Sequence, residues 1–281
     1  MKKTLQRFIP KLIGAKINAL SIANPKAAAQ QAFNIFCTPR KGKPYGEQID
    51  YLNKATYERF TSGSCELQAY RWKGTGKKVL LIHGWESNTH RWFKLVEELQ
   101  QENYDIYAID APAHGNSTGT LLNVPRYAKA IEEAVQRYQP DHIIGHSIGG
   151  LATVFHQYTY KPTQFTSAVI LGSASELSEI MVGYRAILGL NNRTMNSLEQ
   201  LVKELFGFGF KGFSGAAFAK ELTLPALIIH DKFDKITPVS ASQNIHKNWK
   251  GSTYIETEGF GHSLYQEEVR SEIIKFLKKE V

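Results

Sequence analysis

The feature of this 281-residue chain that most constrains its fold is an alternation of short apolar runs and amphipathic helical patterns, beginning near residue 66. Most of the runs are continuously apolar, as in strands buried on both faces. Seven runs predict strands: Leu67–Trp72, Val79–Ile82, Ile106–Ile109, His142–Gly145, Ser167–Leu171, Ala226–His230 and Thr253–Glu256. Five patterns predict helices: Phe93–Gln101, Arg126–Tyr138, Gly149–Tyr158, Ser240–Asn248 and Glu267–Lys279. This alternation predicts an α/β fold with a doubly wound, mostly parallel sheet.

The alternation is interrupted once, between Leu171 and Leu224. This stretch contains short helical patterns and an aromatic–glycine run, Phe206–Phe213. So long an interruption is typical of a functional insertion rather than a plain loop. The phenylalanines of the run are interpreted either as the wall of an apolar acyl pocket or as simple packing.

Residues 1–46 differ from the rest of the chain in charge. They hold nine of the 34 Lys and Arg residues and none of the 26 acidic ones. The remainder therefore carries 25 basic and 26 acidic residues, so the net charge of +8 belongs to the N-terminal segment. Charge gives no support to a nucleic-acid role for the main domain. We divide the chain into a basic helical extension, 1–46, and a main domain, 47–281, with an insertion at about 173–221.

Two helices are expected in the extension. The first is predicted to begin near Pro10 as a first-turn proline, and the second to run from Asn24-Pro25 through Phe36. A linker follows over residues 38–46, which are rich in Pro, Gly and Lys. One interpretation is that these helices pack on the main domain. The alternative is that residues 1–46 form a basic amphipathic segment on an anionic membrane or on a partner.

The composition favours a cytoplasmic protein without a metal site. Cys37 and Cys65 form neither a disulfide framework nor a zinc-binding spacing. No apolar run is long enough to span a bilayer, and Lys11 and Lys16 interrupt the apolar region that a signal peptide needs. The oligomeric state is not fixed by these patterns.

The motif Gly145-His146-Ser147-Ile148-Gly149 lies between a predicted strand and a predicted helix. In this context the serine occupies a tight turn that lifts its hydroxyl above the sheet edge. The two glycines leave room where a Cβ would clash. The helix N-terminus beyond the turn offers backbone N–H groups to a developing oxyanion. Ser147 is therefore the candidate nucleophile.

A serine nucleophile needs a base, and His262 is the best placed of nine histidines. It follows the last predicted strand, at the sheet edge that carries Ser147. The orienting acid should follow the preceding strand, where Asp231 and Asp234 both occur. We favour Asp234, because a residue in the turn reaches a loop histidine more easily than one that continues the strand. Asp231 remains the alternative.

A second oxyanion donor is expected beside the backbone N–H of Ile148. Gly84 and Trp85 directly follow the strand Val79–Ile82, and Gly84 permits a sharp turn. Trp85 is predicted to supply its backbone N–H, while its indole lines the pocket. The other interpretation of the indole is an aromatic ring that caps the core.

These motifs resemble those of the α/β-hydrolase superfamily over roughly residues 66–281. The matching residues are His83-Gly84-Trp85, Asp110–Ser117, Gly145–Gly149, Asp234 with Pro238, and Gly261-His262. The resemblance implies a Ser147–His262–Asp234 triad, backbone donors at Trp85 and Ile148, and no cofactor. It also implies that residues 173–221 form a small helical cap. A glycine is common in the family where Asp231 stands, and the HGGG stretch of one lipase branch is absent.

The chemistry expected is acyl transfer from a small-molecule ester or thioester to water. Amide or carbon–carbon bond cleavage by the same triad is an alternative. A catalytically idle scaffold, used for binding or at a membrane surface, is another. The substrate-binding residues are not assigned by sequence.

Overall fold

The computed structural model describes residues 2–279, which divide into two compact units. The larger unit comprises Pro39–Ser175 and the chain from Gly215 onward. The smaller unit comprises the chain up to Thr38 together with Glu176–Ser214. The N-terminal helices and the insertion therefore share one unit, although nothing in the sequence pairs them.

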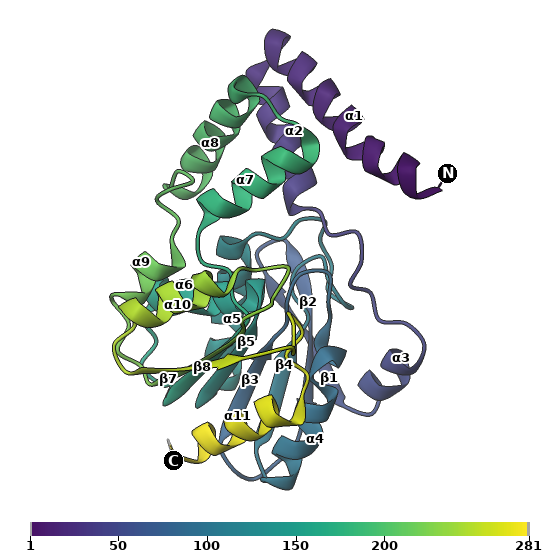
Figure 1. The fold of residues 1–281 in the computed structure, drawn as a ribbon. Coiled ribbons are helices and arrows are strands. Elements are labelled where there is room, and N and C mark those ends of the chain that lie inside the picture. Colours follow the sequence, from purple (N-terminus) through teal and green to yellow (C-terminus); the bar gives the residue numbers. More distant parts are fainter. Residues whose placement is uncertain (1, 280–281) are drawn as a thin grey trace. The chain divides into compact units, whose positions relative to one another are not determined.

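An eight-stranded sheet forms the centre of the larger unit, in the order β1-β2-β4-β3-β5-β6-β7-β8 (Figure 1). Its strands are β1 (Thr56–Ser62), β2 (Cys65–Trp72), β3 (Lys78–Ile82), β4 (Asp105–Ile109), β5 (His142–His146), β6 (Ser167–Leu171), β7 (Ala226–Asp231) and β8 (Ser252–Thr257). Strands β3 to β8 pair in parallel, whereas β1 and β2 are antiparallel at one edge. The predicted α/β fold with a mostly parallel sheet is confirmed.

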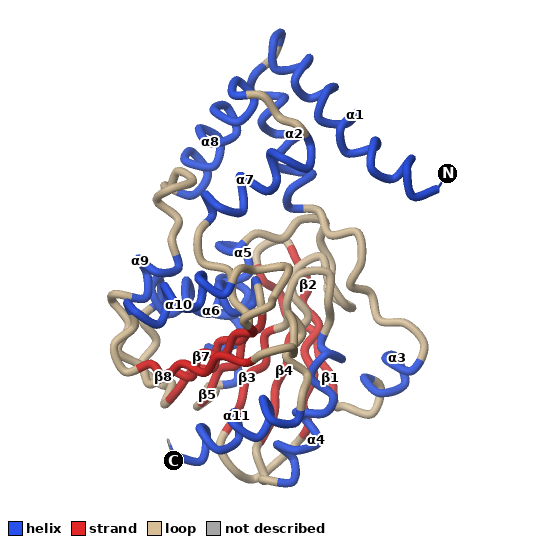
Figure 2. The backbone as a smooth tube through the Cα atoms, viewed as in Figure 1, coloured by secondary structure: helices blue, strands red, loops and turns tan. Residues whose placement is uncertain are grey.

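Helices cover both faces of this sheet (Figure 2). Alternate strand residues such as Leu81 and Ile229 share a buried core with α4 (Phe93–Gln101) and α11 (Glu267–Lys279). The other face is covered by α5 (Val124–Tyr138), α6 (Ile148–Tyr160) and α10 (Val239–Asn248). Burial of the sheet on both faces explains why its central strands are continuously apolar. Three shorter helices complete this unit: α3 (Glu47–Leu52), η1 (Thr89–Trp92) and α9 (Gly215–Ala219).

Strand β1 was not predicted from the sequence. Five of its seven residues are exposed, so it lacks the apolar run that marks the other strands. It forms a hairpin with β2, in which Ser62 pairs with Cys65 across a turn at Gly63, whose φ is +57°. Exposed polar strands are typical of sheet edges, where packing gives little signal.

The smaller unit is made of α1 (Lys2–Ala23), α2 (Pro25–Cys37), α7 (Leu177–Leu188) and α8 (Asn192–Phe206). Helix α2 begins as predicted, with the Asn24 side chain accepting from the Ala27 N–H. Asn18 of α1 joins the insertion, because its side chain donates to the Gly189 carbonyl and accepts from the Asn191 N–H.

The expected start of the first helix near Pro10 is wrong. Helix α1 runs from Lys2 with Pro10 inside it. A proline removes one backbone donor and disfavours the preceding turn, but that cost does not end the helix here. Helix packing beyond Pro10 is close, since a Cβ at Gly14 would lie 1.8 Å from the Leu188 carbonyl oxygen.

The aromatic–glycine run packs within the smaller unit. The Phe206 ring lies 6.0 Å from that of Phe33, and the Phe208 ring 5.8 Å from that of Phe213. Phe210 and Phe213 are buried. These contacts agree with the packing interpretation of the run.

Candidate active site

Ser147 lies in the turn between β5 and α6, in a backbone conformation that residues other than glycine rarely adopt. Its φ is 56° and its ψ −124°. The Ser147 N–H donates to the Leu171 carbonyl at the end of β6, which fixes the turn to the sheet. A Cβ at Gly149 would lie 2.4 Å from the His83 carbonyl oxygen, and one at Gly145 2.7 Å from the Gly149 oxygen. Both glycines are therefore required, and the strain at Ser147 is held by the packing around it.

Three of the predicted side chains meet at the carboxyl edge of the sheet. The Ser147 Oγ lies 3.0 Å from His262 Nε2, and His262 Nδ1 lies 2.7 Å from Asp234 Oδ2. The residues come from three separate loops, after β5, β7 and β8. A continuous relay of this kind lets an imidazole accept the serine proton while a carboxylate stabilises the resulting cation.

Asp234 is shielded and heavily hydrogen-bonded. Its side chain is 0% exposed, and it accepts from the N–H groups of Ile236 and Thr237 and from the Thr237 hydroxyl. The buried His230 also places Nε2 3.2 Å from Asp234 Oδ2. Burial alone would raise the pKa of Asp234, but the hydrogen bonds from His230 and His262 hold that pKa well below its usual range. The carboxylate is therefore ionised at neutral pH.

Asp231 occupies a different position. It is buried, and its Oδ2 accepts from the Phe260 N–H at 2.7 Å and from the Thr257 hydroxyl at 3.0 Å. Burial raises the pKa of Asp231, but the backbone N–H groups of Phe260 and Phe233 lower it further than burial raises it. Asp231 thus ties down the start of the His262 loop, while Asp234 contacts the imidazole itself.

Two arginines hold the other end of the His262 loop. Arg91 Nη2 donates to the Ser263 carbonyl at 2.8 Å, and Arg270 donates to the Tyr265 carbonyl. Between these carbonyls, Leu264 is buried with a φ of +50°. Arg91 is also buried, and its guanidinium lies over the rings of Trp92 and Tyr265. No ion pair is seen for Arg91 among residues 2–279.

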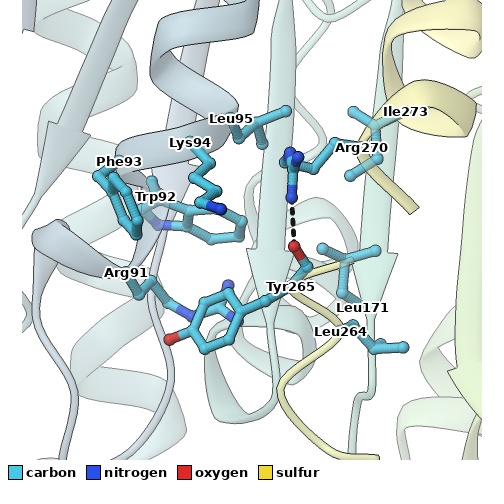
Figure 3. Close-up of a pocket in the computed structure, with 10 residues that line it drawn as sticks. All are labelled: Arg91, Trp92, Phe93, Lys94, Leu95, Leu171, Leu264, Tyr265, Arg270 and Ile273. Carbon is cyan, nitrogen blue, oxygen red and sulfur yellow. Dashed lines mark hydrogen bonds between the residues drawn. The ribbon is translucent and has the colours of Figure 1, made fainter. Parts of the chain in front are cut away.

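The two arginines line a pocket of about 240 Å³ next to this loop (Figure 3). Lys94, Trp92, Tyr265 and Leu264 contribute to the same wall. Sequence reasoning missed Arg91 and Arg270, as it missed His230. Arg91 and Ser263 are 172 residues apart, and no spacing in the sequence joins them.

The turn after β3 approaches the nucleophile closely. A Cβ at Gly84 would lie 3.1 Å from the Ser147 Cβ and 2.8 Å from His146 Nδ1. The glycine thus brings the backbone preceding Trp85 against the turn that begins α6. The Trp85 indole packs edge-on against His114, with ring centroids 5.3 Å apart. Trp85 thus follows a glycine that lies against the Ser147 side chain, and Ile148 is the first residue of α6 after Ser147.

Buried histidines fasten this turn. His83 Nδ1 donates to the Gly84 carbonyl and its Nε2 accepts from the Ala111 N–H. His114 accepts in the same way from the Glu86 N–H. Burial lowers the pKa of His83 to about 3 and also lowers that of His114, so both rings stay neutral as these bonds require.

Asp110 joins the segments that follow β3 and β4 near this turn. It is buried, and its carboxylate accepts from the N–H groups of Thr89 and Asn116 and from the Tyr70 hydroxyl. Burial raises its pKa, and these hydrogen bonds oppose that rise. A Cβ at Gly115 would lie 2.0 Å from the Asp110 carboxyl group. The Asp110–Ser117 segment is thus a support for the loops around the site.

Residues 2–279 contain no group of three or more His, Cys, Asp or Glu side chains arranged to hold a metal ion. In the same range, no helix is both long and apolar enough to cross a bilayer.

Comparison with known proteins agrees with this architecture. A family model described as "alpha/beta hydrolase fold" matches residues 77–196, which include Ser147 but end before Asp234 and His262. A pimeloyl-[acyl-carrier protein] methyl ester esterase of Neisseria meningitidis is 23% identical, over 67% of this chain and 88% of its own. A non-heme haloperoxidase of Rhodococcus erythropolis is also 23% identical, over 62% of this chain and 80% of its own.

A solved structure shows the same fold. An esterase from Exiguobacterium antarcticum superposes with a TM-score of 0.61 at 15% identity, covering 80% of this chain and 99% of its own. At that identity the likeness concerns the fold alone. With its eight-stranded, mostly parallel sheet and its sharp serine turn between β5 and α6, the chain has the α/β-hydrolase fold.

Proposed function

We propose that this protein is a serine hydrolase that cleaves a carboxylic ester or thioester through an acyl-enzyme intermediate. The observation that carries the proposal is the relay of 3.0 Å and 2.7 Å that joins Ser147, His262 and Asp234. Both distances allow proton transfer without rearrangement, and the serine is held on a strained turn at the sheet edge.

The reaction would proceed in two halves. The Ser147 Oγ attacks the acyl carbon while His262 Nε2 takes the hydroxyl proton, and Asp234 stabilises the imidazolium. The tetrahedral intermediate collapses as the C–O or C–S bond breaks, and His262 returns the proton to the leaving alcohol or thiol. Water then attacks the acyl-enzyme with the same base, which releases the carboxylic acid and restores the serine.

The negative charge on the tetrahedral oxygen needs donors that are already oriented. The backbone N–H groups of Trp85 and Ile148 are the proposed pair. The close approach of Gly84 to Ser147, together with the His83 and His114 bonds that fix the turn, supports this assignment. A turn held by neutral buried histidines costs little reorganisation during the reaction.

Ester chemistry is favoured over other acyl chemistry by the relatives. The Neisseria protein is named as an esterase of an acyl-carrier-protein methyl ester, and the Exiguobacterium structure as an esterase. The same triad on this fold could also cleave amides or carbon–carbon bonds. Those reactions are therefore the alternative outcomes of a substrate screen.

The screen consists of p-nitrophenyl acyl esters and acyl thioesters of increasing chain length, with an amide as comparison. Ser147→Ala serves as the matched variant, because it removes one oxygen from a site whose fold rests on other contacts. We expect turnover of esters or thioesters that falls by at least about 10³-fold in Ser147→Ala. Full activity in Ser147→Ala, or hydrolysis of the amide alone, would reject the proposal.

A further inference from the structure

Helix α1 turns an apolar stripe toward solvent. Large apolar side chains on it are 60% exposed at Phe8, 67% at Leu12 and 69% at Ile22. Ala15 and Ala19 are exposed between them. These five positions recur at intervals of three or four residues, so they lie along one side of the helix. A helix of an ordinary globular unit buries such a stripe.

The opposite side of α1 is the one that packs. Gly14, Ile17 and Ser21 are buried. Gly14 lies against the end of α7, and Asn18 binds the Gly189 and Asn191 backbones. The contacts within the smaller unit therefore fix which side of α1 faces outward, and that side is apolar.

Lysines border the exposed stripe on both sides. At 100° per residue, Lys11 and Lys16 fall on opposite flanks of the line from Phe8 to Ile22. Both are exposed, and Lys11 reaches back to the Ala186 carbonyl. Residues 1–46 contain no acidic side chain, so no carboxylate of this segment offsets the charge.

From this arrangement we propose that α1 is an interfacial helix that binds the surface of an anionic lipid bilayer. Phe8, Leu12 and Ile22 would enter the boundary between headgroups and acyl chains, while the flanking lysines would meet lipid phosphates. The lysine-lined, acid-free surface distinguishes this occupant from a second copy of the chain, because two such surfaces would repel each other. The helix would lie in the interface without crossing it, in keeping with a charged lysine on each flank of the stripe.

The test uses the full chain and large vesicles, with co-sedimentation as the readout. One set of vesicles is phosphatidylcholine alone and the other contains about one third phosphatidylglycerol. We expect binding to the anionic set, weakening as salt rises above about 0.1 M because the lysine contribution is screened. Ester hydrolysis plays no part in this readout, so failure of the proposed function leaves it unaffected.

Three variants test whether vesicle binding depends on the exposed stripe of α1 and its flanking lysines. Leu12→Asp should lower the partition coefficient at least about ten-fold, and Lys16→Glu about five-fold or more. Tyr57→Asp is the matched control, because Tyr57 is 61% exposed on β1 of the other unit, and it should bind like the unchanged protein. Circular dichroism and a melting curve verify that each variant is folded.

Several results would overturn the proposal. One is the absence of sedimentation with anionic vesicles, and another is equal binding to the neutral set. A third is unchanged binding by folded Leu12→Asp. A dimer that dissociates in Leu12→Asp without any vesicle binding would instead assign the stripe to a second copy of the chain.

Discussion

The site at the sheet edge buries polar and charged side chains, whereas the outer side of α1 exposes apolar ones. Both arrangements depart from the usual distribution, in which apolar side chains are buried and polar ones are exposed. Around Ser147, charged and polar groups such as Asp234, His230 and Arg91 are shielded from solvent, and each has hydrogen-bond partners. On α1, Phe8, Leu12 and Ile22 are exposed without covering partners. A buried polar group is costly unless it is paired, and an exposed apolar stripe is costly unless something covers it. The buried polar groups are therefore stabilised by partners within the chain, whereas the exposed stripe of α1 would be covered by the lipid surface that we propose.

The largest effect expected on the buried side separates the two candidate acids. Asp234→Asn keeps the shape of the side chain but removes the charge that stabilises the His262 cation. We expect kcat/KM for the best ester to fall about 10³- to 10⁴-fold with the fold retained. Asp231→Asn is the control, because Asp231 contacts the loop backbone and not the imidazole, and it should lose about ten-fold or less. The reverse order of losses would exchange the two assignments.

A smaller effect is expected at the arginines that hold the His262 loop. Arg91→Met removes the donor to the Ser263 carbonyl while keeping much of the side-chain volume. We expect kcat to fall about ten-fold with KM little changed, since a misplaced base affects the transition state more than binding. Arg91→Lys should recover part of the loss. Arg59→Met, at an exposed ion pair with Glu66, is the surface control and should leave kcat unchanged. An unchanged kcat in folded Arg91→Met would remove this positioning role.

The packed side of α1 can be tested apart from the exposed one. A Cβ at Gly14 would lie 1.8 Å from a backbone oxygen of α7, so Gly14→Ala must push the two helices apart. Overpacking of this kind costs about 1–3 kcal/mol. We expect an earlier melting transition in the smaller unit, measured by calorimetry. Ala15→Ser, on the exposed side one residue along, should melt like the unchanged protein, and equal melting of both variants would contradict the packing.

The smallest effect concerns acid stability. The pKa of Asp231 is below its ordinary value in the folded state, so this group stabilises the fold above the ordinary carboxyl pKa. That contribution is lost as pH falls toward the folded pKa. The difference in unfolding free energy between the unchanged protein and Asp231→Asn should therefore be about 1–2 kcal/mol near pH 7 and shrink below about pH 4. Urea titrations at several pH values measure it. A difference that grows as pH falls would give the opposite sign and contradict the lowered pKa.

The sequence predicted the sheet because its central strands are buried on both faces and leave an unbroken apolar run. It missed β1, whose exposed residues carry no such run. Ser147, His262 and Asp234 could be nominated because each follows a strand and parallel strands end at one edge. The partners that fix them could not be nominated. Arg91 and Ser263 meet across 172 residues, and His230 reaches Asp234 only through the turn after β7. Helix α1 passed through Pro10 against expectation, since one lost hydrogen bond did not decide where the helix begins.

The most direct test of the central claim is labelling of the protein with a fluorophosphonate, read by intact mass and peptide mapping. Only a serine activated by a base reacts rapidly with such a reagent. The account predicts one adduct per chain, located on Ser147, absent from Ser147→Ala and much slower in His262→Ala. No adduct on the folded protein, or equal labelling of Ser147→Ala, would contradict it.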